Sequence, residues 1–188
     1  MTTRVYFIRH AEPNYENHND FLRELTTKGL QDSQKLVNLF DKIAIDAFFS
    51  SPYKRSIDTI SPLANSRHKE ITTVTDFRER KITDIWIEDF AGFTEKQWAD
   101  FSYKLDGGES LSQVQTRNIT ALEILLQEYS EKTIIIGTHG TALSTIINYY
   151  DPSFGYNEFQ KIKHIFPWCV KMEFDNLAHL STQEIPWL

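Results

Sequence analysis

The sequence predicts a three-layer α/β/α sandwich with a mostly parallel central sheet and an antiparallel edge. Apolar runs of strand-forming residues alternate along the chain with stretches of helical periodicity, which is the pattern of a parallel sheet covered by helices. The last two strand-like segments, at residues 168–174 and 177–185, are close enough in sequence to pair antiparallel at one edge.

The first strand is expected at residues 5–8, where Val, Tyr, Phe and Ile follow one another. It ends in Arg9 and His10, and Pro13 keeps the following chain out of a helix. Residues 16–24 are polar and rich in Asn and Asp, which is typical of a loop. An arginine suits phosphate or carboxylate, and a neutral imidazole can act as a nucleophile near neutral pH.

A helix is expected to open over residues 25–29, with Thr26 or Thr27 as its N-cap. A second buried strand follows at residues 45–50, and Ser-Pro ends it. The next helix leads to a short β-branched strand at residues 71–74.

Residues 76–103 form the least regular and most aromatic part of the chain, where we expect a cover over the pocket that selects the substrate. Ser110 and Gln113 form a capping box at the start of a long helix. The run 134–136 is a fully apolar strand, and it stops at the polar cluster 137–141 before another helix.

Length and composition limit the class of protein. A chain of 188 residues is expected to form one domain over 1–188. Its net charge of −6 disfavours nucleic-acid and anionic-membrane partners. Cys169 is the only cysteine, so an intrachain disulfide and a cysteine-based zinc site are excluded. We expect a cytoplasmic protein, because the start of the chain has no apolar leader and no run is long enough to span a bilayer. The oligomeric state stays open.

Three buried strands end in charged or titratable residues, and parallel strands bring such ends to one edge of the sheet. Arg9 and His10 follow the first strand, Arg55 follows the second, and His139 follows the strand at 134–136. Two guanidinium groups neutralise phosphoryl oxygens, while one imidazole attacks phosphorus and the other hydrogen-bonds the developing charge. The sequence therefore predicts a phosphoryl site.

The chain resembles the histidine phosphatase superfamily, which has the phosphoglycerate-mutase-like fold. The matching motifs run in family order through most of the chain. They are Arg9-His10-Ala11-Glu12, Leu25-Thr26-x-x-Gly29, Ser50-Ser51-Pro52-x-x-Arg55-x-x-x-Thr59, Phe77-Arg78-Glu79, Gly108-Glu109-Ser110 and Thr138-His139-Gly140.

The resemblance implies a role for each matching residue. His10 is the expected nucleophile that forms a phosphohistidine, and Arg9, Arg55 and His139 are expected to hold the phosphoryl oxygens. Glu79 is the expected general acid for the leaving oxygen and then the base for water. No metal or other cofactor is expected, because the arginines supply the positive charge. The expected partner is a small phosphorylated substrate.

Two positions depart from the family pattern. Ala11 replaces the common glycine after the nucleophile, and Glu16 stands where the signature has asparagine. Asn14 and Asn17 flank that position, so their contact with phosphate stays open.

Other assignments also stay open. Glu79 lies in a run of charged residues, and its rivals as the acid are Glu109 and, further away, Asp84, Glu88 and Asp89. The preferred function is hydrolysis of small organic phosphomonoesters. A phosphoglycerate-type mutase is the first alternative, but few extra cationic residues are available for a second phosphate. A non-catalytic phosphate-binding protein of the same fold is the second.

Overall fold

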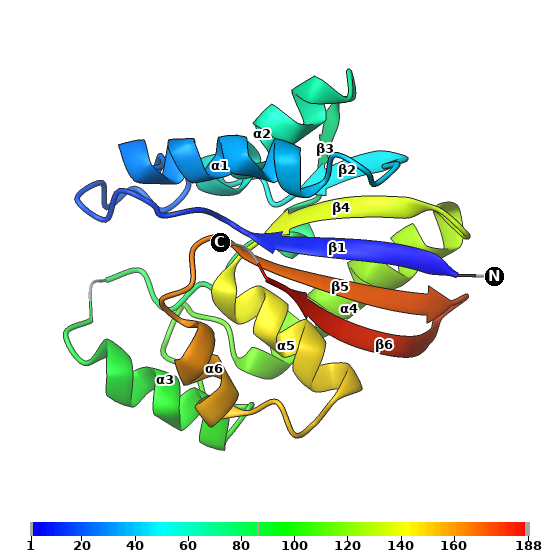
Figure 1. Cartoon of the computed structure of the whole chain (residues 1–188). Coiled ribbons are helices and arrows are strands. Elements are labelled where there is room, and N and C mark those ends of the chain that lie inside the picture. The colour runs from blue at the N-terminus through cyan, green and yellow to red at the C-terminus, as the bar shows by residue number, and fades with distance from the viewer. Residues whose placement is uncertain (1, 86, 187–188) are drawn as a thin grey trace.

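The computed structural model describes residues 2–85 and 87–186, and its centre is a six-stranded sheet (Figure 1). The strand order is β3-β2-β4-β1-β5-β6. The strands are β1 (Thr3–Arg9), β2 (Ala47–Ser50), β3 (Ile71–Thr73), β4 (Thr133–Thr138), β5 (Trp168–Asp175) and β6 (Ala178–Ile185).

The sheet is mixed in the expected way. Strand β1 pairs parallel to β4, β4 pairs parallel to β2, and β2 pairs parallel to β3. Strand β5 pairs antiparallel to β1, and β6 pairs antiparallel to β5. The structure thus confirms a mostly parallel sheet with an antiparallel edge.

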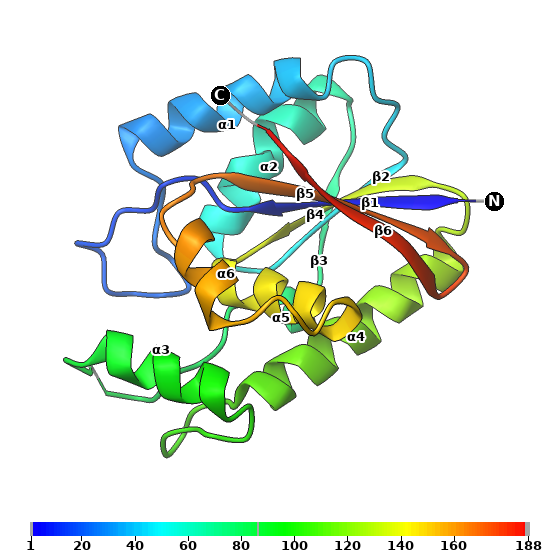
Figure 2. The same cartoon turned by 60° about the horizontal axis from the view of Figure 1, so that its bottom comes forward.

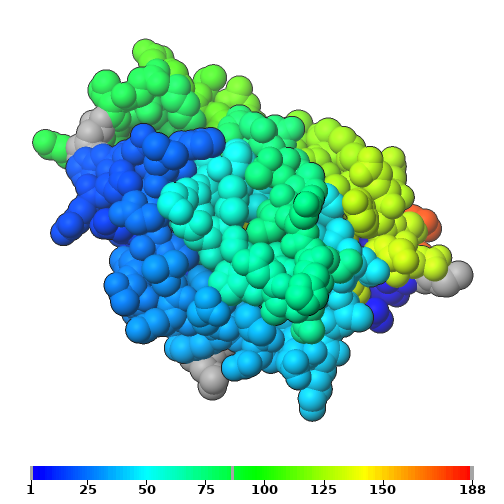
Figure 3. All heavy atoms as spheres, turned by 90° about the horizontal axis from the view of Figure 1, so that it is seen from above, coloured from blue at the N-terminus to red at the C-terminus, as the bar shows by residue number. Residues whose placement is uncertain are grey.

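Helices cover both faces of this sheet. Helices α1 and α2 lie on one face, and Figure 3 shows that face from outside, with the blue and cyan atoms of these helices over it. Helices α3 to α6 lie on the other side (Figure 2). The helices are α1 (Thr27–Leu39), α2 (Lys54–Ser66), α3 (Phe90–Ala99), α4 (Leu111–Glu128), α5 (Gly140–Tyr150) and α6 (Tyr156–Ile162), and a 3₁₀ turn, η1, spans Thr75–Phe77.

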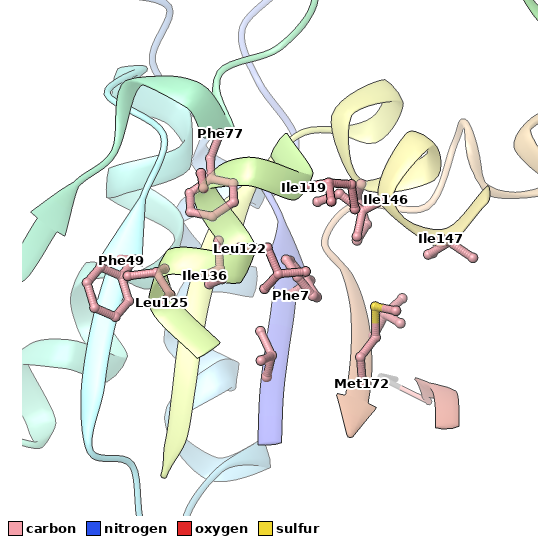
Figure 4. Close-up of a cluster of buried hydrophobic side chains, with 14 of the residues drawn as sticks. Phe7, Phe49, Phe77, Ile119, Leu122, Leu125, Ile136, Ile146, Ile147 and Met172 are labelled. Atoms are coloured by element: carbon pink, nitrogen blue, oxygen red, sulfur yellow. The ribbon is translucent and has the colours of Figure 1, made fainter. Parts of the chain in front are cut away.

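The core has two parts because successive side chains of a strand point to opposite faces of the sheet. Phe7 and Ile136 pack against α4 and α5, in the cluster that Figure 4 shows. Ile8 and Ile135, their neighbours in sequence, pack instead against α1 and α2. Burial on both faces explains why these strands are uninterrupted apolar runs.

Most expected elements are present, including the Thr26 N-cap and the capping box at α4. The expectation of an irregular segment over 76–103 is wrong for residues 90–99, which form α3 behind an Asp89 N-cap. Helix α6 was not expected, because its seven residues include only two buried apolar side chains. Within the described part of the chain, no helix has the length and hydropathy needed to cross a membrane.

Candidate active site

The residues that follow β1, β2 and β4 lie side by side at one edge of the sheet. The pairing of Arg9 with Thr138 continues beyond the strands, since the His10 N–H donates to the Thr138 carbonyl at 3.0 Å. On the other side of β4, the Ser51 N–H donates to the Gly137 carbonyl at 2.9 Å. Backbone hydrogen bonds therefore fix the three strand ends relative to one another.

His10 and His139 face each other at this edge. Their ring centroids are 5.3 Å apart, and the side chains are 5% and 0% exposed. His10 Nδ1 lies 2.8 Å from the Ala11 carbonyl oxygen, which accepts only, so Nδ1 carries the proton. The lone pair of the neutral ring is therefore on Nε2, the nitrogen available for attack.

His139 is held by the end of β2. Its Nε2 lies 2.7 Å from Ser51 Oγ, and its buried Nδ1 has no hydrogen-bond partner among the described residues. Burial, followed by the charge of Arg55, lowers the pKa of both histidines well below the ordinary value of 6.5. Both rings are therefore neutral at neutral pH.

Arg9 is anchored by the C-terminal end of α6. Its terminal nitrogens donate to the carbonyls of Ile162 and Lys163 at 2.8 Å and 3.0 Å, where a helix end favours a cation. The guanidinium also lies 3.9 Å from the centroid of the Phe166 ring. Its buried Nε has no hydrogen-bond partner among the described residues, so one donor remains for an anion. Burial lowers the pKa of Arg9 to about 10, so Arg9 stays a cation at neutral pH.

A glycine makes room for this arginine. A Cβ atom at Gly140, the first residue of α5, would lie 3.0 Å from Arg9 Cζ. The Thr138-His139-Gly140 motif thus gives one strand end, one imidazole and the space for the Arg9 guanidinium.

Arg55 lies in the first turn of α2 and is 3% exposed. Its terminal nitrogens bind Asp20, one donating to the backbone carbonyl and the other lying 3.1 Å from Oδ1. Burial lowers the pKa of Arg55, and the Asp20 charge acts in the opposite direction. Only two of the five guanidinium N–H groups are used in these contacts, so donors remain for another anion.

Helix α2 also holds the turn after His10. The Ala11 N–H donates to Thr59 Oγ1 at 2.8 Å, and that hydroxyl donates to the Arg55 carbonyl at 2.7 Å. Ala11 is fully buried, and its single methyl group is accommodated where the family signature has glycine. The spacing from Arg55 to Thr59 therefore links the turn after His10 to the helix that carries Arg55.

Glu79 lies at the N-terminus of α5, directly beyond His139. Its carboxylate accepts N–H bonds from Thr141 at 3.0 Å and Ala142 at 3.1 Å, and a third from Arg80 at 2.9 Å. The charge of Glu79 acts on the guanidinium groups of Arg9 and Arg55. The structure therefore brings this carboxylate to the same edge of the sheet as the other four predicted residues.

Three of the four rival acids have other partners. Glu109 binds Arg117 at 2.9 Å and Arg78 at 2.8 Å, and burial, which raises its pKa, is outweighed by these hydrogen bonds and charges, so the pKa is lowered. Asp89 caps α3 through the Gly92 N–H, and Asp84 pairs with Lys81.

The two asparagines bind a carboxylate within their own loop. The side-chain amides of Asn14 and Asn17 donate to the two oxygens of Glu24 at 2.7 Å and 2.6 Å. The exposed Glu16 uses its N–H to bind Asn14 Oδ1 at 3.1 Å. In this structure the asparagines thus order the loop that carries Asp20.

Sequence reasoning missed Tyr53 beside His139, Phe166 beside His10 and Asp20, which binds Arg55. The Tyr53 ring lies 5.1 Å from the His139 ring and 5.6 Å from that of Phe21, so an aromatic contact joins the loop to the site. Asp20 was missed because a single Asp in a polar loop has no distinguishing pattern. Tyr53 follows the Ser51-Pro52 signal directly, so its place beside His139 was predictable.

The chain belongs to the histidine phosphatase superfamily, since the family model of its branch 1 matches residues 5–175. This confirms the resemblance inferred from the motifs. Among the relatives, a metal-independent phosphoserine phosphatase of Arabidopsis thaliana is 27% identical over 159 residues, covering 77% of this chain and 67% of that protein.

A phosphoglycerate mutase-like protein of the same plant is 28% identical over 166 residues, covering 79% of this chain and 71% of that protein. The fold is also that of the phosphoserine phosphatase of Entamoeba histolytica, solved as a mutant with phosphoserine. The two structures superpose with a TM-score of 0.79 at 19% identity, covering 97% of this chain and 96% of that one.

Proposed function

We propose that the protein is a phosphatase that hydrolyses small organic phosphomonoesters through a covalent phosphohistidine on His10. The observation that carries this proposal is the buried His10–His139 pair, in which Nε2 of a neutral His10 holds the lone pair. The phosphoserine phosphatases among the relatives support a phosphorylated hydroxy compound as the substrate. We take the whole chain, residues 1–188, as one catalytic domain.

In the first step, His10 Nε2 attacks phosphorus and the bond to the leaving oxygen breaks. Arg9 Nε, the remaining Arg55 donors and His139 Nδ1 hold the phosphoryl oxygens. His139 Nδ1 is a donor in the tautomer in which Nε2 accepts from the Ser51 hydroxyl. The assignment is supported by the buried Arg9 Nε and His139 Nδ1, which have no partner among the described residues. Glu79, which enters this step as the carboxylic acid, gives its proton to the leaving oxygen, which departs as an alcohol.

In the second step, water attacks the phosphohistidine and the bond from phosphorus to Nε2 breaks. Glu79 takes the proton from water, which restores the carboxyl group and releases inorganic phosphate. The two guanidinium groups supply the positive charge that phosphoryl transfer needs, so this sequence of steps uses no metal.

Trapping of phosphate on the enzyme tests the proposal. Wild-type protein quenched during turnover of labelled 4-nitrophenyl phosphate should carry acid-labile, base-stable phosphate, and His10→Ala should carry none and show no turnover. Glu79→Gln should lose about 10²–10⁴-fold with an alkyl phosphate and much less with the aryl ester. Protein that releases no phosphate and traps none would contradict the proposal.

One further assay separates hydrolysis from the mutase alternative. With 3-phosphoglycerate and catalytic bisphosphoglycerate, we expect release of phosphate. Isomerisation without release would instead identify a mutase, and binding without any turnover would identify a non-catalytic protein.

A further inference from the structure

The segment that carries Glu79 lies between elements of regular secondary structure. Residues 78–89 lie between η1 and α3 and form neither helix nor strand among the described positions. A general acid must be held close to its productive geometry, because a misplacement of about 1 Å costs on the order of 10²-fold in rate. Something outside this segment must therefore fix the Glu79 backbone.

Arg117, in the second turn of α4, makes that attachment. One terminal nitrogen donates to the carbonyls of Asp76 and Arg78, the second at 2.9 Å. The other donates to the carbonyl of Glu79 itself at 3.2 Å. Three carbonyls within four consecutive residues thus converge on one guanidinium.

Glu109 uses the remaining donors of Arg117. Arg117 Nε lies 2.9 Å from Glu109 Oε1, and a terminal nitrogen lies 3.1 Å from Oε2. Together with the carbonyls, this gives all five guanidinium N–H groups an acceptor. A lysine has three donors on a single nitrogen and cannot reproduce this planar fork.

Glu109 also holds the far side of the segment. Its Oε2 accepts the Lys81 N–H at 2.9 Å, and the Glu109 N–H donates to the Lys81 carbonyl at 2.7 Å. Gly108 permits this close approach, because a Cβ atom there would lie 1.9 Å from the Ile82 carbonyl oxygen. Hydrogen bonds from Arg117 and Glu109 therefore hold the backbone on both sides of Glu79, at Arg78 and at Lys81.

We propose that Arg117 and Glu109 are positioning residues for Glu79, and that protonation of the leaving group depends on their ion pair. This inference rests on the proposed function. Neither residue acts on the substrate directly: Arg117 acts through the backbone of residues 76–79, and Glu109 acts through Arg117 and Lys81.

The test compares two substrates in two variants. Arg117→Lys keeps the positive charge, which acts on His139, but loses the fork. We expect its kcat/KM to fall about 10- to 100-fold more with an alkyl phosphate than with 4-nitrophenyl phosphate, whose leaving group needs no proton. Arg67→Lys is the matched control, because Arg67 also donates to two carbonyls, those of Phe40 and Asp41, at the end of α1. In Arg67→Lys, the ratio of kcat/KM for the alkyl phosphate to kcat/KM for 4-nitrophenyl phosphate should equal that of wild type.

The decisive measurement is whether the effects of Arg117→Lys and Glu79→Gln on kcat/KM add in the double variant. In a Glu79→Gln background, Arg117→Lys should cause no further selective loss with the alkyl substrate, because the acid is already absent. An equal loss with both substrates, or full activity in Arg117→Lys, would overturn the inference. If Arg117→Lys does not fold, Glu109→Gln tests the same positioning role. The glutamine keeps an oxygen that can accept hydrogen bonds but removes the negative charge of the ion pair.

Failure of the inference differs from failure of the proposed function. If wild type turns over and Glu79→Gln is selective for the leaving group while Arg117→Lys is not, only the positioning role is wrong. If wild type traps no phosphate on His10, the proposed function itself is wrong.

Discussion

The Asp20 carboxylate lies 3.1 Å from the Arg55 guanidinium, the group proposed to bind phosphoryl oxygens. The same oxygen, Oδ1, lies 3.3 Å from Arg23, so one carboxylate oxygen is shared by two arginines. Asp20 is half exposed whereas Arg55 is 3% exposed, so the loop brings negative charge to a buried cation. A phosphoryl group on Arg55 would meet this negative charge.

Asp20→Asn should therefore tighten anion binding. The amide keeps an oxygen that can accept from Arg55 and Arg23 but removes the charge that repels a phosphate dianion. We expect the inhibition constants of inorganic phosphate and vanadate to fall on the order of fivefold, equivalent to about 1 kcal/mol. Competitive inhibition assays with 4-nitrophenyl phosphate measure the change.

Asp58→Asn serves as the control for Asp20→Asn. Asp58 is paired with Lys54 on α2, so its loss also removes one acidic partner of a cation. Its inhibition constants should match wild type. Weaker inhibition of Asp20→Asn would instead show that the carboxylate supports anion binding by orienting Arg55.

The sequence alone was sufficient to predict which strand ends meet. Strands β1, β2 and β4 are short and buried on both faces, so each is a visible apolar run with a polar residue at its end. Parallel pairing then brings these ends to one edge. His10 and His139 needed only this local signal.

The attachments of Glu79 and Asp20 were not predictable in this way. They depend on loops whose contacts are made by distant residues: Arg117 on α4 binds the backbone of Glu79, and Arg55 on α2 binds Asp20. The anchoring of Arg9 was missed for a similar reason: Arg9 binds the carbonyl of Ile162, the last residue of α6, 153 residues later in the chain. Such contacts leave no periodic trace in the sequence.

The stability of the protein should fall on acidification because of the two buried histidines. Burial lowers the folded-state pKa of His10 and His139, so below pH 6.5 the unfolded chain binds more protons than the folded one. The stability that depends on these two neutral histidines is fully present above pH 6.5, and it is lost as the pH falls toward their folded-state pKa. Each histidine costs about 1.4 kcal/mol per pH unit in that window. Urea unfolding at pH 8.0 and pH 5.5 measures the loss.

Replacement of one buried and one exposed histidine tests whether the buried histidines cause this pH dependence of stability. Between pH 8.0 and pH 5.5, the free energy of unfolding should fall less in His10→Gln than in wild type. In His164→Gln, where the replaced histidine is exposed, it should fall as much as in wild type. An unchanged slope in His10→Gln would mean that other groups cause the acid sensitivity.

Gly29→Ala should destabilise the protein although alanine is the better helix former. A Cβ atom at position 29 would lie 2.3 Å from the backbone oxygen of Glu12, two residues after His10. Backbone must then move, at a cost of about 1–3 kcal/mol in unfolding free energy. Gly155→Ala is the control, because its nearest neighbour would lie at 3.8 Å, an ordinary contact. Equal stability of the two variants in urea would contradict the packing argument.

The Tyr53 ring should matter for activity more than its hydroxyl does. The ring contacts both His139, at a centroid distance of 5.1 Å, and Phe21, so it fixes one side of the proposed phosphoryl site. Tyr53→Phe keeps these contacts and should retain kcat/KM within about twofold. Tyr53→Ala removes them, and a loss of about 0.5–1.5 kcal/mol corresponds to a decrease of roughly 2- to 10-fold. A large loss in Tyr53→Phe would mean that the hydroxyl, and not the ring, contacts the substrate. The two variants measured with one aryl phosphate at constant pH distinguish these roles.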